Sequence, residues 1–380
     1  MFLHLFIFLF AFLGLSFFKE VGSPEQRQIA RKKYIVFIMF LLAIQSGLRN
    51  VAVGNDTLAY YYMYDSVMNS SWGQVLFQAL LPNSKDPGYA ILTKAISTIL
   101  PSYRLYLIAI AVFFFTALGR VFYKYLHNNT EVLVGIGLYE CLYYGFFSIT
   151  GHRQTIATAI LLFALPLIFK DTHRIRNGLL FFVLLVLAST IHKTAFLFAP
   201  MYFLPRLRRN KMVFILAFAL FIPMFFVGPT LGNYLDDTEF EQYAHYLQQG
   251  DTAGAIVFSV YIVLLATAVF FKRKAINAYS PNNYVFASAI AVAMLLSPLL
   301  MLNPNNQRIV QYYSIFGLII LPQICDVYSV AGKKSIHYLV FAVLALYTLL
   351  RQEPYAFFWQ DMVFGDTGQI VNDGILNQIQ

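Results

Sequence analysis

Four cationic side chains stand beside other polar residues at the ends of apolar runs, where a hydrophobic chain is best able to hold a charged substrate. They are Arg49, Arg153, Lys193 and Arg308. Arginine binds phosphate oxygens through paired hydrogen bonds, and four cations together suit an anion of high charge. These residues therefore predict a diphosphate site, with Gln154, Thr57 and Tyr60 as further candidates for binding the diphosphate or an attached sugar.

Two residues near these cations are candidate general bases. Asp56 follows Arg49 along the chain, and a carboxylate beside cations stays ionised. It is expected either to orient Arg49 or to accept a proton from a sugar hydroxyl. His192, beside Lys193, is the other candidate, because a neutral imidazole near cations suits a base. A membrane histidine can also be purely structural, so both alternatives stay open.

The sequence predicts neither a metal nor a cofactor. It contains no H-E-x-x-H pattern, no paired His/Cys spacing and no phosphate-binding G-x-x-x-x-G-K-[ST] motif. The acidic stretch 236–241 could hold a divalent ion, but a solvated loop is the favoured interpretation. Cys141 and Cys325 lie within apolar runs and are interpreted as packing residues.

The elements that must position these residues are membrane-spanning helices. Apolar residues make up 59% of the 380 residues and charged residues only 12%, against roughly 25% in soluble domains. Continuous apolar runs recur about twelve times between residues 1 and 350, without the alternation of a membrane strand. We therefore expect an all-α fold, a polytopic transmembrane bundle of about 12 helices in a single membrane domain, 1–350.

The distribution of basic residues predicts the orientation of this bundle. If residues 19–33 are cytoplasmic, alternate connections place 19 of the 27 Lys and Arg residues in the cytoplasm, as the positive-inside rule requires. The other eight, which include the four cations of the predicted site, then face the periplasm, and so do both chain termini. Because loop residues account for the net charge of +9, no nucleic-acid partner is expected.

Three hydrophilic segments are predicted on the periplasmic side. The first loop, 49–102, is long enough to carry short interfacial helices. One of these helices is expected to start at Asp86-Pro87-Gly88-Tyr89, because proline suits the first helical position. The other two segments are an acidic loop, 228–253, and a polar C-terminal tail, 351–380.

The segment around His192 is expected to turn inside the protein. Residues 177–204 lie between two cationic loops, so the charge rule requires two crossings of only about 14 residues each. At about 1.5 Å per residue such a helix covers roughly 21 Å of a hydrocarbon layer about 30 Å thick. Polar backbone at that depth is tolerated only where it is buried in protein or lines a wet cavity.

Several short motifs occur in order along the chain. They are Gly47-Leu48-Arg49, Gly54-Asn55-Asp56-Thr57 with Tyr60, Asp86-Pro87-Gly88-Tyr89, Arg153-Gln154, His192-Lys193-Thr194-Ala195, and Arg308 ahead of Tyr312-Tyr313. In this order they resemble the EpsG family of bacterial polysaccharide-synthesis proteins, which is grouped with Wzy-type O-antigen and capsule polymerases. The resemblance covers roughly residues 40–320 and does not extend beyond residue 330.

The resemblance implies an enzyme of the bacterial inner membrane that polymerises oligosaccharide repeat units carried on undecaprenyl diphosphate. Such an enzyme transfers the growing chain onto a new lipid-linked unit at the periplasmic face. Its expected partners are this lipid-linked substrate, the surrounding membrane lipid and a chain-length regulator. The predicted cations would stabilise the departing lipid diphosphate, so no metal is required. Asp56 or His192 would deprotonate the acceptor hydroxyl.

Two other functions involve similar substrates. An O-antigen ligase would carry out related chemistry, whereas a flippase or transporter would move the intact lipid-linked unit across the membrane. A transporter is expected to place charged groups through the full depth of its helices, but the unexplained cations of this chain gather at one face. This pattern favours an enzyme, a metal-independent membrane glycosyltransferase.

Overall fold

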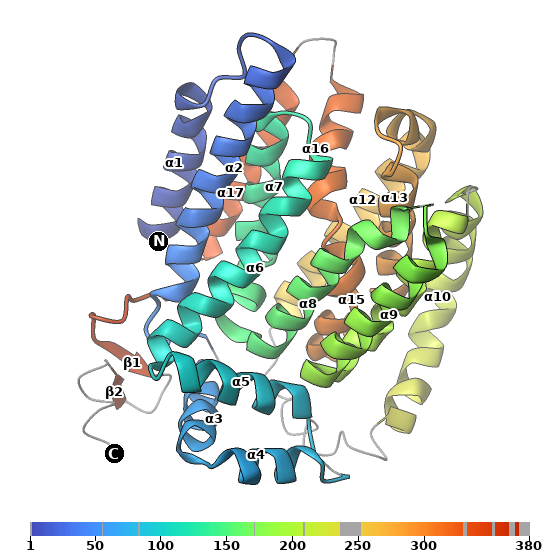
Figure 1. Cartoon of the computed structure of the whole chain (residues 1–380). Helices are drawn as coiled ribbons and strands as arrows, with labels where there is room; N and C mark the ends of the chain where they lie inside the picture. Colours follow the sequence, from blue (N-terminus) through green and yellow to red (C-terminus); the bar gives the residue numbers. More distant parts are fainter. Residues whose placement is uncertain are drawn as a thin grey trace. The chain divides into compact units, whose positions relative to one another are not determined.

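The computed structural model of the chain is dominated by helices (Figure 1). It describes residues 2–54, 56–82, 84–170, 172–207, 210–235, 252–329, 333–351, 354–364 and 369–371. The residues form two compact units, each built from segments that are distant in sequence. Unit 1 comprises residues 1–166, 182–196 and 337–380, and unit 2 comprises residues 167–181 and 197–336.

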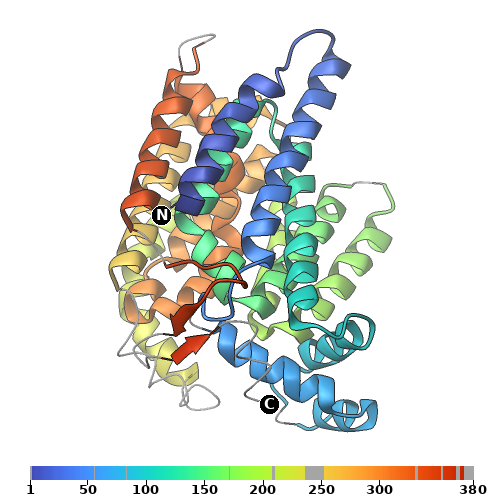
Figure 2. The same cartoon turned by 90° about the vertical axis from the view of Figure 1, so that its left-hand side faces the viewer.

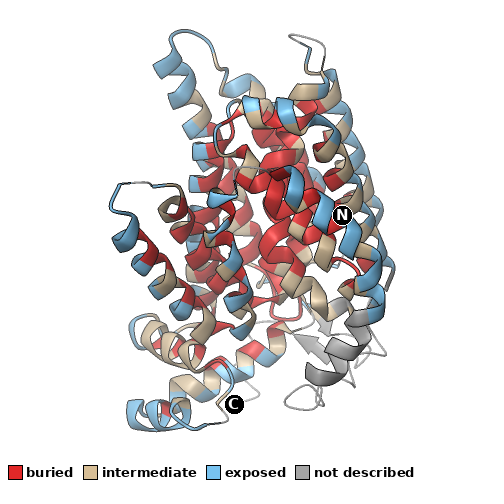
Figure 3. Cartoon of the chain, turned by 90° about the vertical axis from the view of Figure 1, so that its right-hand side faces the viewer, coloured by how far each residue is buried: buried red, intermediate tan, exposed pale blue. Residues whose placement is uncertain are grey.

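Unit 1 is a bundle of long helices. They are α1 (Phe2–Phe17), α2 (Pro24–Gly47), α6 (Tyr103–Tyr125), α7 (Asn129–Leu142), α8 (His152–Ala164) and α17 (Ser335–Arg351), with a π-helical turn, η1 (Tyr144–Thr150), between α7 and α8. α2 and α6 pack along each other, and Gly47 permits this because a β-carbon there would lie 3.0 Å from the Cα atom of Ile108. Large aromatic side chains such as Tyr106 and Phe114 fill the interior, and buried residues follow the inner sides of the helices (Figure 3).

Three short helices lie at one end of the unit 1 bundle (Figure 1). They are α3 (Thr57–Asn69), α4 (Trp72–Ala79) and α5 (Pro87–Ile99). Reciprocal hydrogen bonds between Ser71 and Gln74 start α4, and Pro87 is the first residue of α5, as predicted. The short helices expected in the loop 49–102 are therefore present, and their location in the membrane interface stays a prediction.

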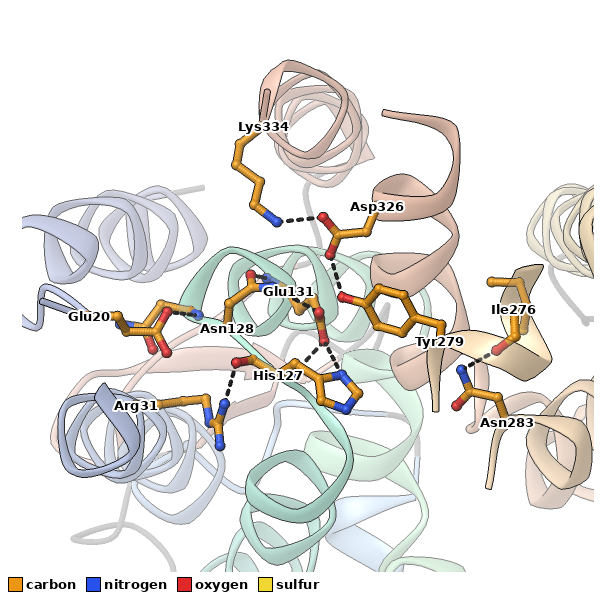
Figure 4. A network of polar contacts seen from close by, with 11 residues as sticks. Glu20, Arg31, His127, Asn128, Glu131, Ile276, Tyr279, Asn283, Asp326 and Lys334 are labelled. Atoms are coloured by element: carbon orange, nitrogen blue, oxygen red, sulfur yellow. Dashed lines mark hydrogen bonds and ion pairs between the residues drawn. The ribbon is translucent and has the colours of Figure 1, made fainter. Parts of the chain in front are cut away.

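Unit 2 is also helical. Its elements are the first half of α9 (Arg174–Ile191), η4 (Leu204–Arg206), α10 (Asn210–Leu235), α12 (Thr252–Tyr279), α13 (Asn283–Leu296), α14 (Leu299–Leu302), η7 (Pro304–Asn306), α15 (Gln307–Ser314) and α16 (Gly317–Tyr328). The 3₁₀ helices η2 (Leu165–Phe169) and η3 (Lys193–Tyr202) each contain a boundary between the units. α13 packs against α10, α12 and α15, and Asp326 accepts hydrogen bonds from Tyr279 and Lys334 (Figure 4).

Five helices of the described residues are long and apolar enough to cross a membrane, and the number is seven if each of two bent pairs forms one span. The chain is therefore a polytopic helical membrane protein, but the expected number of about twelve crossings is not confirmed. Some continuous apolar runs are broken helices: α7 and η1 meet at 70°, and α15 and α16 at 48°. The second short crossing expected after His192 is instead the 3₁₀ helix η3, which contains Pro200, a residue without an N–H to donate.

Polar contacts join neighbouring helices at the end of the unit 1 bundle opposite α3, α4 and α5 (Figure 4). Arg31 of α2 donates a hydrogen bond to the carbonyl of His127, and the carboxylate of Glu131 accepts one from the backbone N–H of His127. The basic connections 19–33 and 120–127 lie at this end, away from the short helices. Within unit 1, the basic loops and the predicted site residues are thus at opposite ends, as the charge distribution predicts.

The described part of the C-terminal tail returns to the C-terminal end of α2 (Figure 2). It contains two short antiparallel strands, β1 (Met362–Phe364) and β2 (Gln369–Val371), which lie outside the helical bundle. The acidic loop predicted at 228–253 is shorter than expected, because α10 continues to Leu235 and α12 begins at Thr252. Residues 236–251, which carry its acidic side chains, lie outside the described residues.

Reporter fusions test the predicted orientation. We expect alkaline phosphatase to be active, and green fluorescent protein to be dark, when fused after Gln380, because the positive-inside rule places this end in the periplasm. Fusions after Lys170, in a basic connection, should give the reverse result. Fluorescence at Gln380 together with phosphatase activity at Lys170 would contradict the orientation.

Candidate functional site

Asp86 is contacted by two other segments of unit 1. Nη1 of Arg153 donates a hydrogen bond to its carboxylate at 2.6 Å, and the backbone N–H of Lys193 donates another at 3.1 Å. Nδ1 of His192 lies 3.9 Å from the same carboxylate. Because Asp86 is only 3% exposed, these contacts gather α5, the start of α8 and the end of α9 around one buried charge.

The turn before α5 directs this carboxylate away from its own helix. Asp86 has a left-handed backbone, with φ at 54°, and its side chain does not cap α5. Such a conformation costs a non-glycine residue roughly 1 kcal/mol or more, and it is found where the surroundings impose it. Gly88 then allows α5 to approach α9, since a β-carbon there would lie 2.2 Å from Oγ1 of Thr190. The Asp-Pro-Gly turn therefore places Asp86 against the end of α9.

Tyr60 of α3 contacts both Arg153, the partner of Asp86, and His152, which contacts Arg49. Its hydroxyl accepts a hydrogen bond from Nε of Arg153 at 3.3 Å, and the guanidinium carbon is 5.6 Å from the centre of its ring. The ring also stacks on His152, with centroids 4.2 Å apart and planes 14° from parallel. Arg153 is thereby held by both a carboxylate and an aromatic ring.

Arg49 lies on the other side of His152. Its Nη2 is 2.6 Å from Nε2 of His152, and it also donates a hydrogen bond to the carbonyl of Ser46. A guanidinium only donates, so Nε2 accepts, and the neutral imidazole carries its proton on Nδ1. Among the residues that the structure describes, His152 Nδ1 has no hydrogen-bond partner. Arg49 is 3% exposed, and its two acceptors are uncharged, so the burial of its positive charge is costly.

The remaining predicted residues of unit 1 lie close by in the chain but have other contacts. Thr57 is fully buried, and its hydroxyl lies 2.6 Å from the carbonyl of Val53 and 2.8 Å from that of Ile149. Asp56 is half-buried at the residue before α3, and Gln154 is buried on α8. In the structure Thr57 thus holds the turn after Arg49, and sugar contacts by these three residues stay predictions.

The other two predicted cations are Lys193 and Arg308. The side chain of Lys193 is exposed, and it is its backbone N–H that reaches Asp86. Arg308 lies near the start of α15 in unit 2. The structure therefore brings Arg49, Arg153 and the His192–Lys193 turn together within unit 1, and the participation of Arg308 stays a prediction.

Two residues of this site, Asp86 and His152, were not among the predicted ones. Asp86 has an ordinary role before Pro-Gly, as the start of a helix, and its burial could not be read from the sequence. The signal for His152 was its position next to Arg153 at the end of an apolar run. Its contacts with Tyr60 and Arg49 join residues roughly a hundred positions apart, which no local pattern reveals.

The surroundings of Asp86 act in opposite directions on its protonation. Burial raises the pKa of the carboxyl group, whereas His192, the guanidinium of Arg153 and the backbone N–H of Lys193 lower it. The partners outweigh burial, so the pKa is below its ordinary value. Asp86 is therefore an anion at neutral pH and offsets the charge of Arg153.

These features define a polytopic membrane protein with a buried ionic site at one end of a helical bundle. A comparison with family models matches residues 32–356 to the EpsG family. The chain belongs to the EpsG family, which confirms the resemblance seen in the motifs. Neither the curated proteins nor the solved structures contain a match to the chain.

Replacement of Asp86 by Asn tests the contribution of this ionic site to stability. Because a buried cation loses its carboxylate, we expect a loss on the order of 3 kcal/mol at pH 7, seen as a lower melting temperature of the purified protein. Asp65→Asn is the control, since that half-buried carboxylate accepts a hydrogen bond from the amide of Asn69 on the same helix.

The difference in stability between the wild type and Asp86→Asn is expected to depend on pH. A carboxyl group whose pKa is lowered by folding contributes its full stabilisation above its ordinary pKa, about 4, and loses it as the pH falls further. The difference between the wild type and Asp86→Asn should therefore shrink below about pH 4. An equal difference at pH 7 and pH 3 would contradict the proposed ionisation of Asp86.

Proposed function

We propose that this EpsG-family protein is a polysaccharide polymerase of the bacterial inner membrane. It transfers a growing glycan from undecaprenyl diphosphate to a new lipid-linked repeat unit at the periplasmic face, and it needs no metal or other cofactor. Family membership supports the general role in polysaccharide synthesis. The observation that carries the specific proposal is the buried Arg49, whose acceptors in the described structure are uncharged.

The charges of the site indicate which cation is available for an anionic substrate. The charge of Arg153 is offset by Asp86 at 2.6 Å, and both side chains are largely buried. Arg49 has instead an imidazole and a carbonyl as acceptors, so its full charge can act on a ligand. A buried cation is stabilised most by an anion that enters the same region of low dielectric constant. A diphosphate is the anion that the family role provides.

Arg153 is suited to fix the geometry of the bound substrate. Its guanidinium has five N–H donors, of which Asp86 and Tyr60 engage two in the described contacts. The side chain is 16% exposed, so it also reaches the surface of the site. It lies near the N-terminus of α8, where the dipole of the helix favours an anion. We assign Arg153 the role of orienting the diphosphate beside Arg49.

His192 is the better placed of the two candidate bases. An aspartate near Nδ1 of a histidine orients the ring and stabilises the imidazolium that forms when the ring accepts a proton. Asp86 has this relation to His192, at 3.9 Å, and such distances commonly shorten when substrate binds. Asp56 stays a candidate on sequence grounds, at the residue before α3.

The proposed step forms a glycosidic bond and breaks the bond between the sugar and the diphosphate. The acceptor hydroxyl oxygen attacks the anomeric carbon of the growing chain, and the bond between this carbon and the diphosphate oxygen breaks. The electron pair leaves with the lipid diphosphate, where Arg49 and Arg153 stabilise the added negative charge. The hydroxyl proton passes to Nε2 of His192. Sugar, proton and leaving group are thereby all accounted for without an oxidant or an external energy source.

Reconstitution with lipid-linked repeat units tests this function. The purified protein in liposomes should produce longer lipid-linked glycans, visible as a ladder on a gel. Arg49→Ala should lower the rate by about 100-fold or more, because the main uncompensated cation is removed. Arg49→Lys should retain part of the activity, since lysine keeps the charge but cannot bind two oxygens in parallel. Arg351→Ala, at the exposed end of α17, is the matched control and should retain activity.

Three results of this assay would reject the proposal. Movement of the intact repeat unit across the bilayer without elongation indicates a flippase. Transfer only to a lipid other than the carrier indicates a ligase. Elongation that is unchanged in Arg49→Ala removes the diphosphate role of this residue even if the chain is a polymerase.

His192→Gln tests the base. Glutamine keeps a polar side chain of similar length but accepts no proton at neutral pH, so kcat should fall by about 100-fold while the KM of the acceptor changes little. Asp56→Asn in the same assay separates the two candidates. A large loss of kcat in Asp56→Asn, with His192→Gln nearly unaffected, would transfer the role of base to Asp56.

A further inference from the structure

The C-terminal segment 355–360 pairs with the backbone on both sides of Arg49. The N–H of Asn50 donates a hydrogen bond to the carbonyl of Ala356 at 2.8 Å, and the N–H of Phe358 donates one to the carbonyl of Leu48 at 3.0 Å. These bonds form an antiparallel bridge in which Arg49 faces Phe357. The turn that carries Arg49 is therefore held by a strand-like partner from the far end of the chain (Figure 2).

Side chains strengthen this pairing at both of its ends. The amide nitrogen of Asn50 donates a hydrogen bond to the carbonyl of Gln360 at 2.8 Å, while its amide oxygen accepts one from the N–H of Ala52. The hydroxyl of Tyr355 donates to the carbonyl of Gln45, in the last turn of α2, at 2.7 Å. These bonds connect the segment to residues before and after Arg49.

The segment is also anchored from the side of the bundle. The guanidinium carbon of Arg104, near the start of α6, lies 2.9 Å from the centre of the Phe358 ring. Within the segment, the side-chain oxygen of Gln360 accepts a hydrogen bond from the N–H of Phe357, which closes a tight turn. The anchor and the turn leave little freedom to the backbone that pairs with residues 48–50.

We infer that residues 355–360 are a positioning element of the Arg49 site. Without their backbone bonds, the short turn after α2 has few partners that fix the direction of the Arg49 side chain toward His152. The match to the family ends at residue 356, so most of this segment lies outside the part of the chain that the family model describes. The inference deepens the proposed function, because it assigns the tail to the site that would bind diphosphate.

Arginine-specific labelling tests the inference independently of catalysis. Phenylglyoxal modification, located by mass spectrometry, should spare the buried Arg49 in the full-length protein. In a chain that ends after Pro354, which lacks the segment, the labelling of Arg49 should rise at least fivefold. A chain that ends after Asp361 keeps the segment without the β1–β2 hairpin and is the matched control, with labelling as in the full-length protein.

A point variant covers the case in which the shorter chain does not fold. Gln360→Ala removes the hydrogen bond to the N–H of Phe357 but leaves the chain complete. It should raise the labelling of Arg49 by about twofold or more while the protein elutes as a single species. Unchanged labelling in Gln360→Ala, or in a folded chain ending after Pro354, would overturn the inference.

Steady-state kinetics distinguish positioning from direct substrate binding by the tail. If the segment acts through Arg49, loss of residues 355–380 should lower kcat at least tenfold and leave the KM of the acceptor within about twofold. An increase in KM with unchanged kcat would instead indicate that the tail binds the glycan, and would overturn a purely positioning role. If the protein shows no polymerase activity at all, the proposed function fails, while the labelling result still decides the inference.

Discussion

A single carboxylate organises the site of this membrane protein. Asp86 receives Arg153, the backbone of Lys193 and the imidazole of His192, which come from two other segments of unit 1. Without this anion, a largely buried guanidinium and the polar turn after α9 would have to share a region that is otherwise apolar. Bringing these groups together requires a left-handed backbone at Asp86 and a residue without a β-carbon, Gly88, beside α9. The rest of the site extends from this point through Tyr60 and His152 to Arg49.

The two arginines illustrate how similar residues acquire different roles from their partners. Arg153 is neutralised and held in place, so it contributes geometry. Arg49 is buried among neutral groups, so it contributes charge. The stacked rings of Tyr60 and His152 connect the two arginines, because Arg153 contacts Tyr60 and Arg49 contacts His152. In the proposed function, this division of roles explains why a site for an anion also contains a carboxylate.

Much of this site could be predicted from the sequence, because charged residues are rare in the chain and each unexplained one is informative. Arg49, Arg153 and the His192–Lys193 turn were found in this way, and the structure brings them into one unit. Asp86 was overlooked because aspartate before Pro-Gly has an ordinary explanation, and nothing local reveals its left-handed backbone. The expected number of about twelve crossings is not confirmed, and hydropathy does not show where an apolar run bends. The π-helical turn after α7 and the 3₁₀ helix that contains Pro200 are such places.

If Arg49 binds a lipid diphosphate, as proposed, its burial also links the folding of this protein to its supply of substrate. A positive charge enclosed by neutral groups makes the unoccupied form less stable than the form that holds an anion, and by mass action any ligand bound only to the folded state shifts the folding equilibrium toward it. The concentration of lipid-linked precursor would then set the lifetime of the protein in the membrane as well as its rate of turnover. A cell that stops making precursor would lose the unoccupied protein first, without a dedicated regulator.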